Sequence, residues 1–432
     1  MREQNIEPEP AQDKNPPKQG SYSLIGIASL ISAVSVFIFT WLVQKTLPAQ
    51  ETNVFLVYWS FGSLIFASIV GIQHETARAV GFTLARSEQP TSLTRRAHPL
   101  KMGSIIGGLV ALGLVATSPL WGRAVFGEQY FLNVLSIAVA TALYAAHVSV
   151  VGIFAGYKHW DVFSFLITAE GLIRLGISLT VAFLFLSITG YKFAFIAPVI
   201  LWLILIGLSP KNRAMVTQAC VVESPKVLAQ QMTWSIFSTV AFAIMSTGFP
   251  VLLQISYGHK GSVEQQALMA AVILGINITR APVMIPLQAF QGVAISAFLE
   301  QRHRPVSALA KPVGIILGVG FGGGVLAYLI GPFLFDLIYK NLQGILSAPV
   351  LALMTVDSAL MALVVLSGTA TLAMNLHRLY LSGWIVTVAV AVALLYLLPF
   401  SVDWGASTAL FIAPLLGFFT HLAGLVYSGR KE

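Results

Sequence analysis

The sequence predicts an all-α polytopic membrane protein with about twelve transmembrane helices, arranged in two six-helix lobes around a central cavity. Composition is the first observation behind this fold class. Hydrophobic residues make up 56% of the 432 residues and charged residues 10%, whereas an ordinary soluble domain has about 25% charged residues. A surface that faces water cannot be covered by so few charges, so the bilayer must be the solvent.

The spacing of apolar residues is the second observation. They gather in segments that are each able to cross about 30 Å of hydrocarbon as a helix. The segments are 22–44, 53–80, 102–121, 130–156, 160–187, 189–209, 227–256, 265–298, 308–338, 345–373, 379–400 and 404–427. An even number of spans places both ends of the chain on the same side of the membrane.

These segments divide the chain into parts of similar size. A disordered cytoplasmic tail (1–21) precedes the N-terminal six-helix lobe (22–209), and a cytoplasmic inter-lobe loop (210–226) leads to the C-terminal six-helix lobe (227–428) and a short cytoplasmic tail (429–432). Two parallel six-helix repeats give this pattern, with a substrate site at their interface near the midplane.

The distribution of Lys and Arg orients the spans. With both termini placed inside, the tails and even-numbered loops hold 18 basic residues: Arg2, Lys14, Lys18, Arg78, Arg86, Arg95, Arg96, Lys101, Lys158, Lys211, Arg213, Lys226, Arg302, Arg304, Lys311, Arg378, Arg430 and Lys431. The odd-numbered loops hold 5: Lys45, Arg123, Lys192, Lys260 and Lys340. This bias predicts a multi-pass protein of the inner (plasma) membrane with cytoplasmic N- and C-termini.

Arg174 and Arg280 are the two basic residues deep inside predicted spans. A midplane arginine costs roughly 2.5–3.5 kcal/mol on insertion scales, so each should face the bundle interior or a wet cavity. Arg174 follows Glu170 at the i,i+4 spacing, and a local ion pair is one explanation for both residues. The other is a substrate site in which Glu170 and Arg174 contact the cargo.

Arg280 has no acidic residue on its own segment, and Pro282 and Pro286 follow it. Prolines remove backbone donors and favour a bent helix, and bent helices at membrane depth commonly line a cavity. Asp357 on another segment is a candidate structural partner. The alternative is that Arg280, with the nearby Asn277, binds substrate, because a guanidinium binds phosphate or pyrophosphate bidentately.

Four further polar residues are candidates for coupling or gating. Glu75 and Arg78 lie three residues apart at the inner end of the second segment, where they form either an interfacial ion pair or a polar entrance to the cavity. His147 and Asp357 lie well inside their spans, and each is either a satisfied buried group or a group that takes up a proton during transport.

The sequence also predicts absences. The basic excess of +8 is explained by topology, so no nucleic-acid partner is expected. No paired Cys or His spacing, P-loop or nucleophile elbow is present, so we expect no metal, no cofactor and no catalytic residue. The lipid bilayer is the one certain partner of such a surface.

The chain resembles the polysaccharide transporters of the multidrug/oligosaccharidyl-lipid/polysaccharide (MOP) superfamily, the Wzx-like flippases. The resemblance covers about residues 21–428 and rests on six plus six spans, GIQHETARAV at 71–80 and TRAPVMIPLQAF at 279–290. It implies a flippase that moves a polyprenyl-pyrophosphate-linked saccharide, a precursor of cell-wall or surface polysaccharide, to the outer leaflet by alternating access. Glycan assembly enzymes would then be partners.

Competing hypotheses remain open. A cation-coupled multidrug or small-molecule antiporter of the same superfamily is the main alternative, although the first segment contains no Asp or Glu. A major-facilitator transporter lacks support because the loop after the second segment is basic without that family's pattern. A membrane glycosyltransferase or polymerase is disfavoured by the short outside loops, which leave no room for a catalytic domain.

The charge bias makes a prediction about sidedness. The loop at 81–100 should be cytoplasmic and the loop at 122–129 outside. A thiol introduced at Gln129 should therefore react with an impermeant reagent in intact cells, while one at Ser92 should react only after the cells are opened. The reverse labelling pattern would invert the topology.

Overall fold

The computed structural model describes residues 19–86, 97–258, 262–300, 305–374 and 376–429, so most of the N-terminal tail and the loop around Ser92 lie outside the described residues. The first half of the chain forms α1 (Gln19–Thr46), α2 (Ala49–Arg86), α3 (Pro99–Phe126), α4 (Tyr130–Gly156), α5 (Trp160–Thr180), α6 (Ile188–Ile196), α7 (Leu201–Leu208) and α8 (Pro210–Gln218). The second half forms α9 (Pro225–Ser246), α10 (Phe249–Tyr257), α11 (Val263–Glu300), α12 (Pro305–Ile338), α13 (Ala348–Ala373), α14 (His377–Leu397) and α15 (Val402–Gly429).

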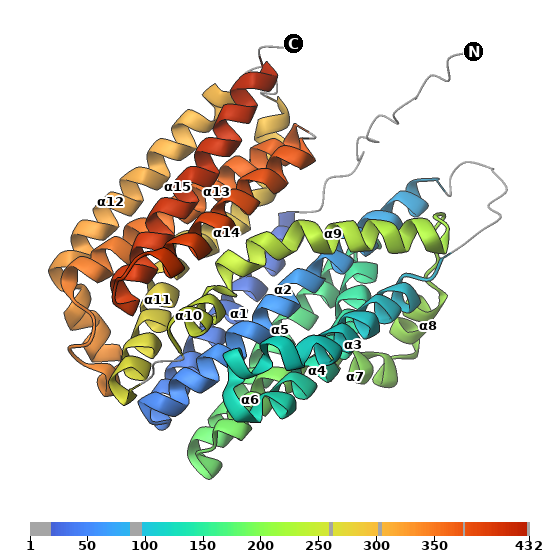
Figure 1. The fold of residues 1–432 in the computed structure, drawn as a ribbon. Helices are drawn as coiled ribbons and strands as arrows, with labels where there is room; N and C mark the ends of the chain where they lie inside the picture. The colour runs from blue at the N-terminus through green and yellow to red at the C-terminus, as the bar shows by residue number, and fades with distance from the viewer. Residues whose placement is uncertain (1–18, 87–96, 259–261, 301–304, 375, 430–432) are drawn as a thin grey trace.

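The prediction of an all-α membrane protein with about twelve spans is confirmed. Eleven stretches of the described chain are long and apolar enough to cross a membrane, and the 58-residue stretch Pro99–Gly156 contains two helices, α3 and α4. Figure 1 shows the helices gathered in two groups, with α1–α8 in one and α11–α15 in the other. We call these groups the N-terminal and C-terminal lobes.

Two predicted spans are interrupted. Pro198 lies in the 3-10 turn Ala197–Ile200 that separates α6 from α7, because proline removes the backbone donor that a continuous helix needs. Thr247 and Gly248 separate α9 from α10, and Pro250 occupies the first turn of α10. By contrast, α11 continues as one helix through Pro282, so that proline does not end the helix.

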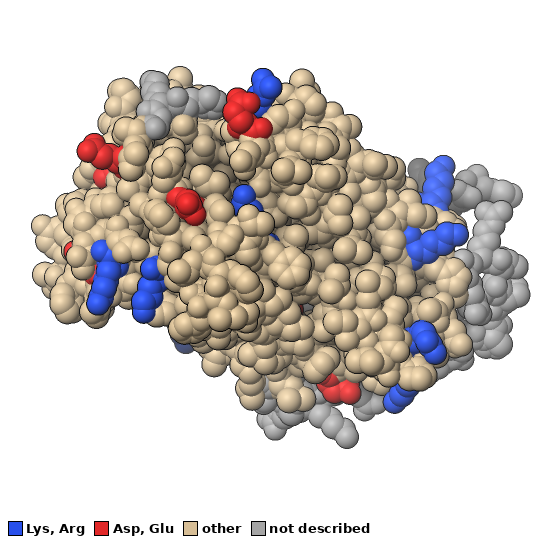
Figure 2. Space-filling view, turned by 90° about the horizontal axis from the view of Figure 1, so that it is seen from below, with Lys and Arg blue, Asp and Glu red and all other residues tan. Residues whose placement is uncertain are grey.

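The outer surface of the helices is apolar. Leu120, Phe183, Leu208 and Leu397 are 88%, 79%, 81% and 77% exposed. Figure 2 shows one face of the molecule, on which charged side chains stand in ones and twos among uncharged atoms. Such a surface is stable in contact with lipid tails. In water it would be a large exposed hydrophobic patch, which soluble monomers rarely have.

The two lobes share one hydrophobic core at the predicted outer end. Phe39, Phe55 and Tyr191 of the N-terminal lobe belong to the same buried cluster as Ile273 and Val350 of the C-terminal lobe. Two hydrogen bonds cross the junction there. The indole of Trp41 donates to the Ile338 carbonyl (3.2 Å), and the amide of Asn341 donates to the Gln44 carbonyl (3.0 Å).

The lobes have separate cores at the predicted inner end. One cluster there includes Ile72 and Val148 of the N-terminal lobe, and another contains Leu309 and Leu425 of the C-terminal lobe. Among the residues whose burial is described, α9 is the exception, because its Leu228 and Met232 are buried in the N-terminal cluster. The described structure is therefore closed at the outer end, and α9 lies across α2 at the inner end (Figure 1).

Close packing of α9 on α2 depends on Gly71. A Cβ atom at this position would lie 2.6 Å from the carbonyl carbon of Ser235, and a helix backbone cannot yield as a flexible side chain can. Thr239 reinforces the contact, since its hydroxyl donates to the Ser68 carbonyl (2.7 Å). The small residue lets the two backbones approach, as at many helix interfaces in membranes.

We predict that Gly71→Ala separates α9 from α2 and lowers the melting temperature of the purified protein. Gly108→Ala in α3 is the matched control, because nothing lies within 4 Å of a Cβ there. The control should be neutral or slightly stabilising, since alanine is favoured over glycine in a helix by about 0.5–1 kcal/mol. Equal melting temperatures for the two variants would show that the contact is not needed.

Candidate functional site

A buried polar cluster lies between α4 and α5 in the N-terminal lobe. The Arg174 guanidinium donates to Glu170 Oε1 at 2.6 Å, and His147 Nε2 lies 3.8 Å from Glu170 Oε2. The ring of Tyr144 stacks on His147, with centroids 5.7 Å apart. His147 is 3% and Arg174 8% exposed, whereas the Glu170 side chain keeps 26% of its surface. We call these four residues the N-cluster.

Helix geometry explains how the N-cluster forms. Glu170 and Arg174 are four residues apart on α5, and Tyr144 and His147 are three apart on α4, so each pair lies on one face of its helix. The ion pair predicted from the sequence is present. Glu170 neutralises the guanidinium and is also the partly exposed member of the pair.

Arg280 is the centre of a second cluster, in the C-terminal lobe. Its Nη1 donates to the carbonyls of Met245 (2.9 Å) and Ser246 (3.1 Å). These carbonyls are free because α9 ends at Ser246, and the end of a helix carries a partial negative charge that attracts a cation. Arg280 is 8% exposed. Its guanidinium donates to the free carbonyls at the point where α9 ends and the predicted span 227–256 is interrupted. Backbone carbonyls are partners that the sequence did not suggest.

Asp357 on α13 completes this C-cluster. It is 2% exposed and close enough to Arg280 for electrostatic attraction, while neither of its carboxylate oxygens has a hydrogen-bond partner among the described residues. The neighbouring Ser358 hydroxyl donates to Thr279 across the same helix pair (3.4 Å). Asn277, one helical turn before Arg280, also has a buried amide nitrogen without a described partner.

The two clusters are built separately. No hydrogen bond or ion pair among the described residues joins the N-cluster to the C-cluster. The proposed substrate-binding set is therefore divided, with Glu170 and Arg174 in one lobe and Asn277 and Arg280 in the other. A cargo that touched both sets would have to lie between the lobes.

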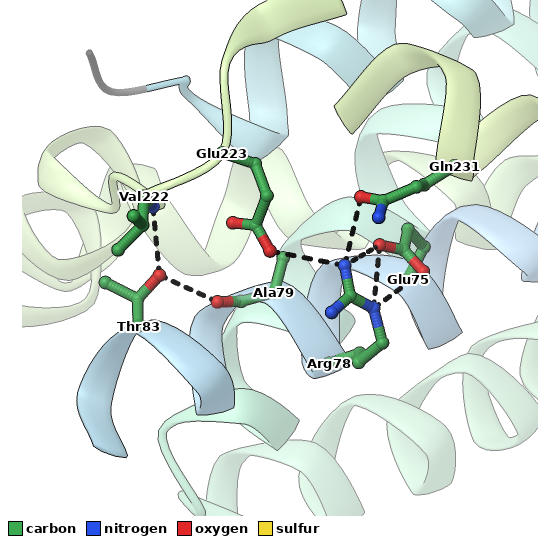
Figure 3. Close-up of polar contacts among 7 residues, drawn as sticks. All are labelled: Glu75, Arg78, Ala79, Thr83, Val222, Glu223 and Gln231. Atoms are coloured by element: carbon green, nitrogen blue, oxygen red, sulfur yellow. Dashed lines mark hydrogen bonds and ion pairs between the residues drawn. The ribbon is translucent and has the colours of Figure 1, made fainter. Parts of the chain in front are cut away.

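A third group of polar residues lies at the inner end of α2 (Figure 3). Arg78 Nε donates to both oxygens of Glu75 (2.9 and 3.0 Å), and its Nη2 donates to Glu223 (3.2 Å) and to Gln231 of α9 (3.0 Å). Nearby, the Val222 amide donates to the Thr83 hydroxyl (3.1 Å). We call Glu75, Arg78, Glu223 and Gln231 the inner clamp.

The inner clamp holds α9 and the segment before it against the N-terminal lobe. It contains two carboxylates and one guanidinium, so it is not a cationic entrance. Glu223 and Gln231 are 145 and 153 residues from Arg78, and no local spacing in the sequence indicates that they meet. The predicted pair of Glu75 and Arg78 is present, but its role in this structure includes tying two distant parts of the chain together.

No group of three or more His, Cys, Asp or Glu side chains able to hold a metal ion occurs among the described residues. In the N-cluster a carboxylate and an arginine form an ion pair, whereas in the C-cluster both oxygens of Asp357 lack a hydrogen-bond partner among the described residues.

The fold is that of the MOP-superfamily transporters. A multidrug resistance MATE family transporter of that superfamily in an inward-facing conformation matches with a TM-score of 0.65 and 12% identity, over 97% of both chains. A MOP superfamily transporter from Pyrococcus furiosus, described by a reversed polarity of its binding pocket, gives 0.64 and 13%, over 95% of this chain and 96% of that one. At these identities the likeness establishes the fold.

The sequence relatives define the family. No protein-family model matches the chain. It is 31% identical to uncharacterized protein Rv1510 of Mycobacterium tuberculosis over 96% of this chain and 94% of that protein. Uncharacterized protein Rv3630 of the same organism is also 31% identical, over 94% and 92%. The chain belongs to the family of these mycobacterial proteins.

We predict that Arg280→Gln strongly reduces the yield of folded protein. The change removes the hydrogen bonds to the end of α9 and leaves the buried Asp357 carboxylate without a nearby cation, and an uncompensated buried charge costs about 3–5 kcal/mol. Adding Asp357→Asn should restore much of the melting temperature, because the unpaired charge is then gone. Arg213→Gln is the control, since this arginine of α8 is exposed and surface charges contribute about 0–1 kcal/mol. A double variant no more stable than Arg280→Gln would show that Asp357 is not the partner.

Proposed function

We propose that the protein transports its cargo by alternating access of the two lobes. The observation that carries this proposal is the asymmetry of the core: one cluster joins both lobes at the predicted outer end, while separate clusters fill the inner ends. Two lobes that meet at one end only can rock about that contact and close at the other. The described structure corresponds to the state that is open inward.

Asp357 is the residue that we propose couples transport to a proton or a monovalent cation. A carboxylate that is 2% exposed and lacks hydrogen-bond donors is unstable as an anion unless something compensates it. Arg280 compensates part of the charge, and a proton or cation would compensate the remainder. His147 and Glu170 are the corresponding titratable pair in the N-terminal lobe.

The first cargo that we propose is a small amphipathic or cationic molecule, exported in exchange for the coupling ion. Its support is that both deep arginines already have partners, Arg174 in Glu170 and Arg280 in the helix-end carbonyls of Met245 and Ser246. The inter-lobe space is therefore less cationic than the sequence suggested. A MATE family transporter described as a multidrug resistance protein also matches in an outward-facing conformation, with a TM-score of 0.65 and 13% identity over 94% of this chain and 96% of that one.

A polyprenyl-pyrophosphate-linked saccharide is the second cargo. Two observations favour it: α1 contains no Asp or Glu in its 28 residues, and Glu170 is partly exposed beside Arg174. A pyrophosphate arriving between the lobes would displace Glu170, which accepts one bond from Arg174, and would accept two from the same guanidinium. Transport would then run from the cytoplasmic to the outer leaflet, with glycan assembly enzymes on either side.

Two measurements on one strain distinguish these cargoes. Depletion of a flippase should cause a lipid-linked saccharide to accumulate in the cytoplasmic leaflet, where mass spectrometry identifies it. Loss of an antiporter should instead raise sensitivity to cationic dyes without such accumulation. If depletion produced both effects to the same degree as depletion of an unrelated membrane protein, neither cargo would be supported.

We predict that locking the outer junction stops transport. In a Cys220→Ser background, cysteines at Gln44 and Asn341 should be joined by a short thiol cross-linker, because the Asn341 amide contacts the Gln44 carbonyl. Gradient-driven dye uptake into inside-out vesicles should then fall to background and return on reduction. Cysteines at Asn133 and Lys192, which contact each other within one lobe (2.8 Å), are the control. Full transport in the locked protein would contradict alternating access.

We also predict that Asp357→Asn yields folded protein without coupled transport. Asparagine keeps the shape and removes the charge, so the proton or cation has no site. The melting temperature should stay close to that of the parent, because the carbonyls of Met245 and Ser246 still accept from the Arg280 guanidinium, while an imposed pH or sodium gradient should no longer drive dye uptake. Unchanged gradient-driven uptake would exclude Asp357 as the coupling residue.

A further inference from the structure

Lys192 is one of the few basic residues at the predicted outer end, and its side chain reaches into the N-terminal lobe. It lies on α6, one helical turn after the helix begins at Ile188. Its Nζ donates to Asn133 Oδ1 on α4 (2.8 Å) and lies 5.1 Å from the centre of the Tyr58 ring on α2. Asn133 and Tyr58 are 8% and 1% exposed. The ammonium is therefore held between three helices, whereas a lysine near the end of a span commonly extends outward to water.

The described chain does not neutralise this ammonium. No carboxylate of the described residues lies within 4.0 Å of Lys192 Nζ, and the two contacts of Nζ are a neutral amide oxygen and an aromatic ring. An ammonium has three N–H donors, and Asn133 accepts from one of them. Charged side chains at membrane depth are costly unless they are paired, so an anion from outside the chain is the missing partner.

The surroundings of Lys192 are open to the lipid. α4 packs on α7 and on the 3-10 turn Ala197–Ile200, but its contact with α6 is slight. Lys192 keeps part of its surface exposed, and the residues beside the contact, Leu132 on α4 and Phe193 on α6, are 69% and 58% exposed. The lysine thus bridges two helices that otherwise contact each other little, between side chains that face lipid.

The depth of Lys192 indicates which anion is available. Four residues of α6 correspond to a rise of about 6 Å, and the polar layer of a bilayer is about 5–8 Å thick on each side of the hydrocarbon. The ammonium therefore lies at the level of the lipid head groups, where phosphate is the abundant anion. A lysine binds phosphate as a point charge. A lipid with a net negative charge is favoured over a zwitterionic one, which carries its own cation beside the phosphate.

We propose that Lys192 and Asn133 form a site for the phosphate of an anionic lipid in the outer leaflet. Asn133 positions the ammonium, the phosphate accepts its remaining hydrogen bonds, and the lipid chains lie against Leu132 and Phe193. The bound lipid joins α6 to α4 and so stabilises the N-terminal lobe. Neither residue of the site belongs to the N-cluster or the C-cluster. The inference goes beyond the proposed transport function, assigns the site no part in the transport step and does not depend on the cargo.

The test is lipid binding by the purified, delipidated full-length protein in neutral detergent. Phosphatidylglycerol, phosphatidylcholine with the same acyl chains, and inorganic phosphate are each titrated against the melting temperature, and bound lipids are counted by native mass spectrometry. Phosphatidylglycerol should stabilise the protein saturably and bind about fivefold more tightly than phosphatidylcholine, as one lysine beside an anionic lipid allows. Equal stabilisation by phosphatidylcholine would show that the head-group charge is not recognised, and equal stabilisation by inorganic phosphate would exclude a lipid site.

Variants assign the effect to this lysine. Lys192→Gln should lose the preference for phosphatidylglycerol, and Lys192→Arg should retain it. Asn133→Asp places a carboxylate on the ammonium, so it should raise the melting temperature without lipid and remove most of the effect of phosphatidylglycerol. This variant decides the question should Lys192→Gln fail to fold. Lys45→Gln is the matched control, because Lys45 Nζ also lies over a ring at the outer end, that of Trp41 (4.6 Å), but on an exposed residue.

Two results would overturn the site. One is an equal loss of lipid preference in Lys192→Gln and Lys45→Gln, which would indicate a general attraction of anionic lipid to surface charge. The other is an undiminished effect of phosphatidylglycerol on Asn133→Asp. Neither measurement involves transport, so failure here is distinct from failure of the transport proposal.

Discussion

The compensation of charge inside a lipid-surrounded helix bundle is the constraint on which the rest of this structure depends. With no water at membrane depth, a guanidinium must find acceptors within the protein. Arg174 finds Glu170 one turn away, and Arg280 finds the carbonyl end of α9 together with Asp357. The first solution lies within the N-terminal lobe, whereas the second joins the C-terminal lobe to the end of α9.

The sequence predicts the membrane spans well, but it predicts only some of the partners of the charged side chains. The reasons are physical. Hydropathy is local, so the twelve apolar segments correspond closely to helices. The Arg174–Glu170 pair follows from spacing on one helix and was likewise predictable. The contacts of Arg280 with Met245 and Ser246 were not, because those carbonyls become available only where α9 stops. Glu223 and Gln231 of the inner clamp were missed because no local pattern relates them to Arg78.

The difference between local and long-range contacts also explains where α9 packs. A division at residue 227 assigns this helix to the C-terminal lobe by chain order, yet Leu228 and Met232 are buried with the N-terminal lobe, while Met245 belongs to the shared outer core. The hydrophobicity of a segment predicts that it is buried, but it does not predict which neighbouring helix the segment packs against. Gly71 and the inner clamp specify the neighbour, and both can be recognised only once α2 and α9 are seen together. α9 thus contacts both lobes. Its inner half must slide along the N-terminal lobe or detach from it if the inner ends of the two lobes close.

Compensated charge also limits how the protein can select a cargo. If each deep arginine is neutralised before the cargo binds, its positive charge alone cannot select the cargo. Selectivity must then depend on which partner of the arginine the cargo can displace. In the N-cluster that partner is Glu170, which is partly exposed and can be replaced by a phosphate. In the C-cluster the helix-end carbonyls cannot leave, so Arg280 stays bound and Asp357 alone is free to exchange a proton or ion. Under the transport proposal, the N-terminal lobe would therefore contact the cargo through Glu170, and the C-terminal lobe would bind the coupling ion through Asp357.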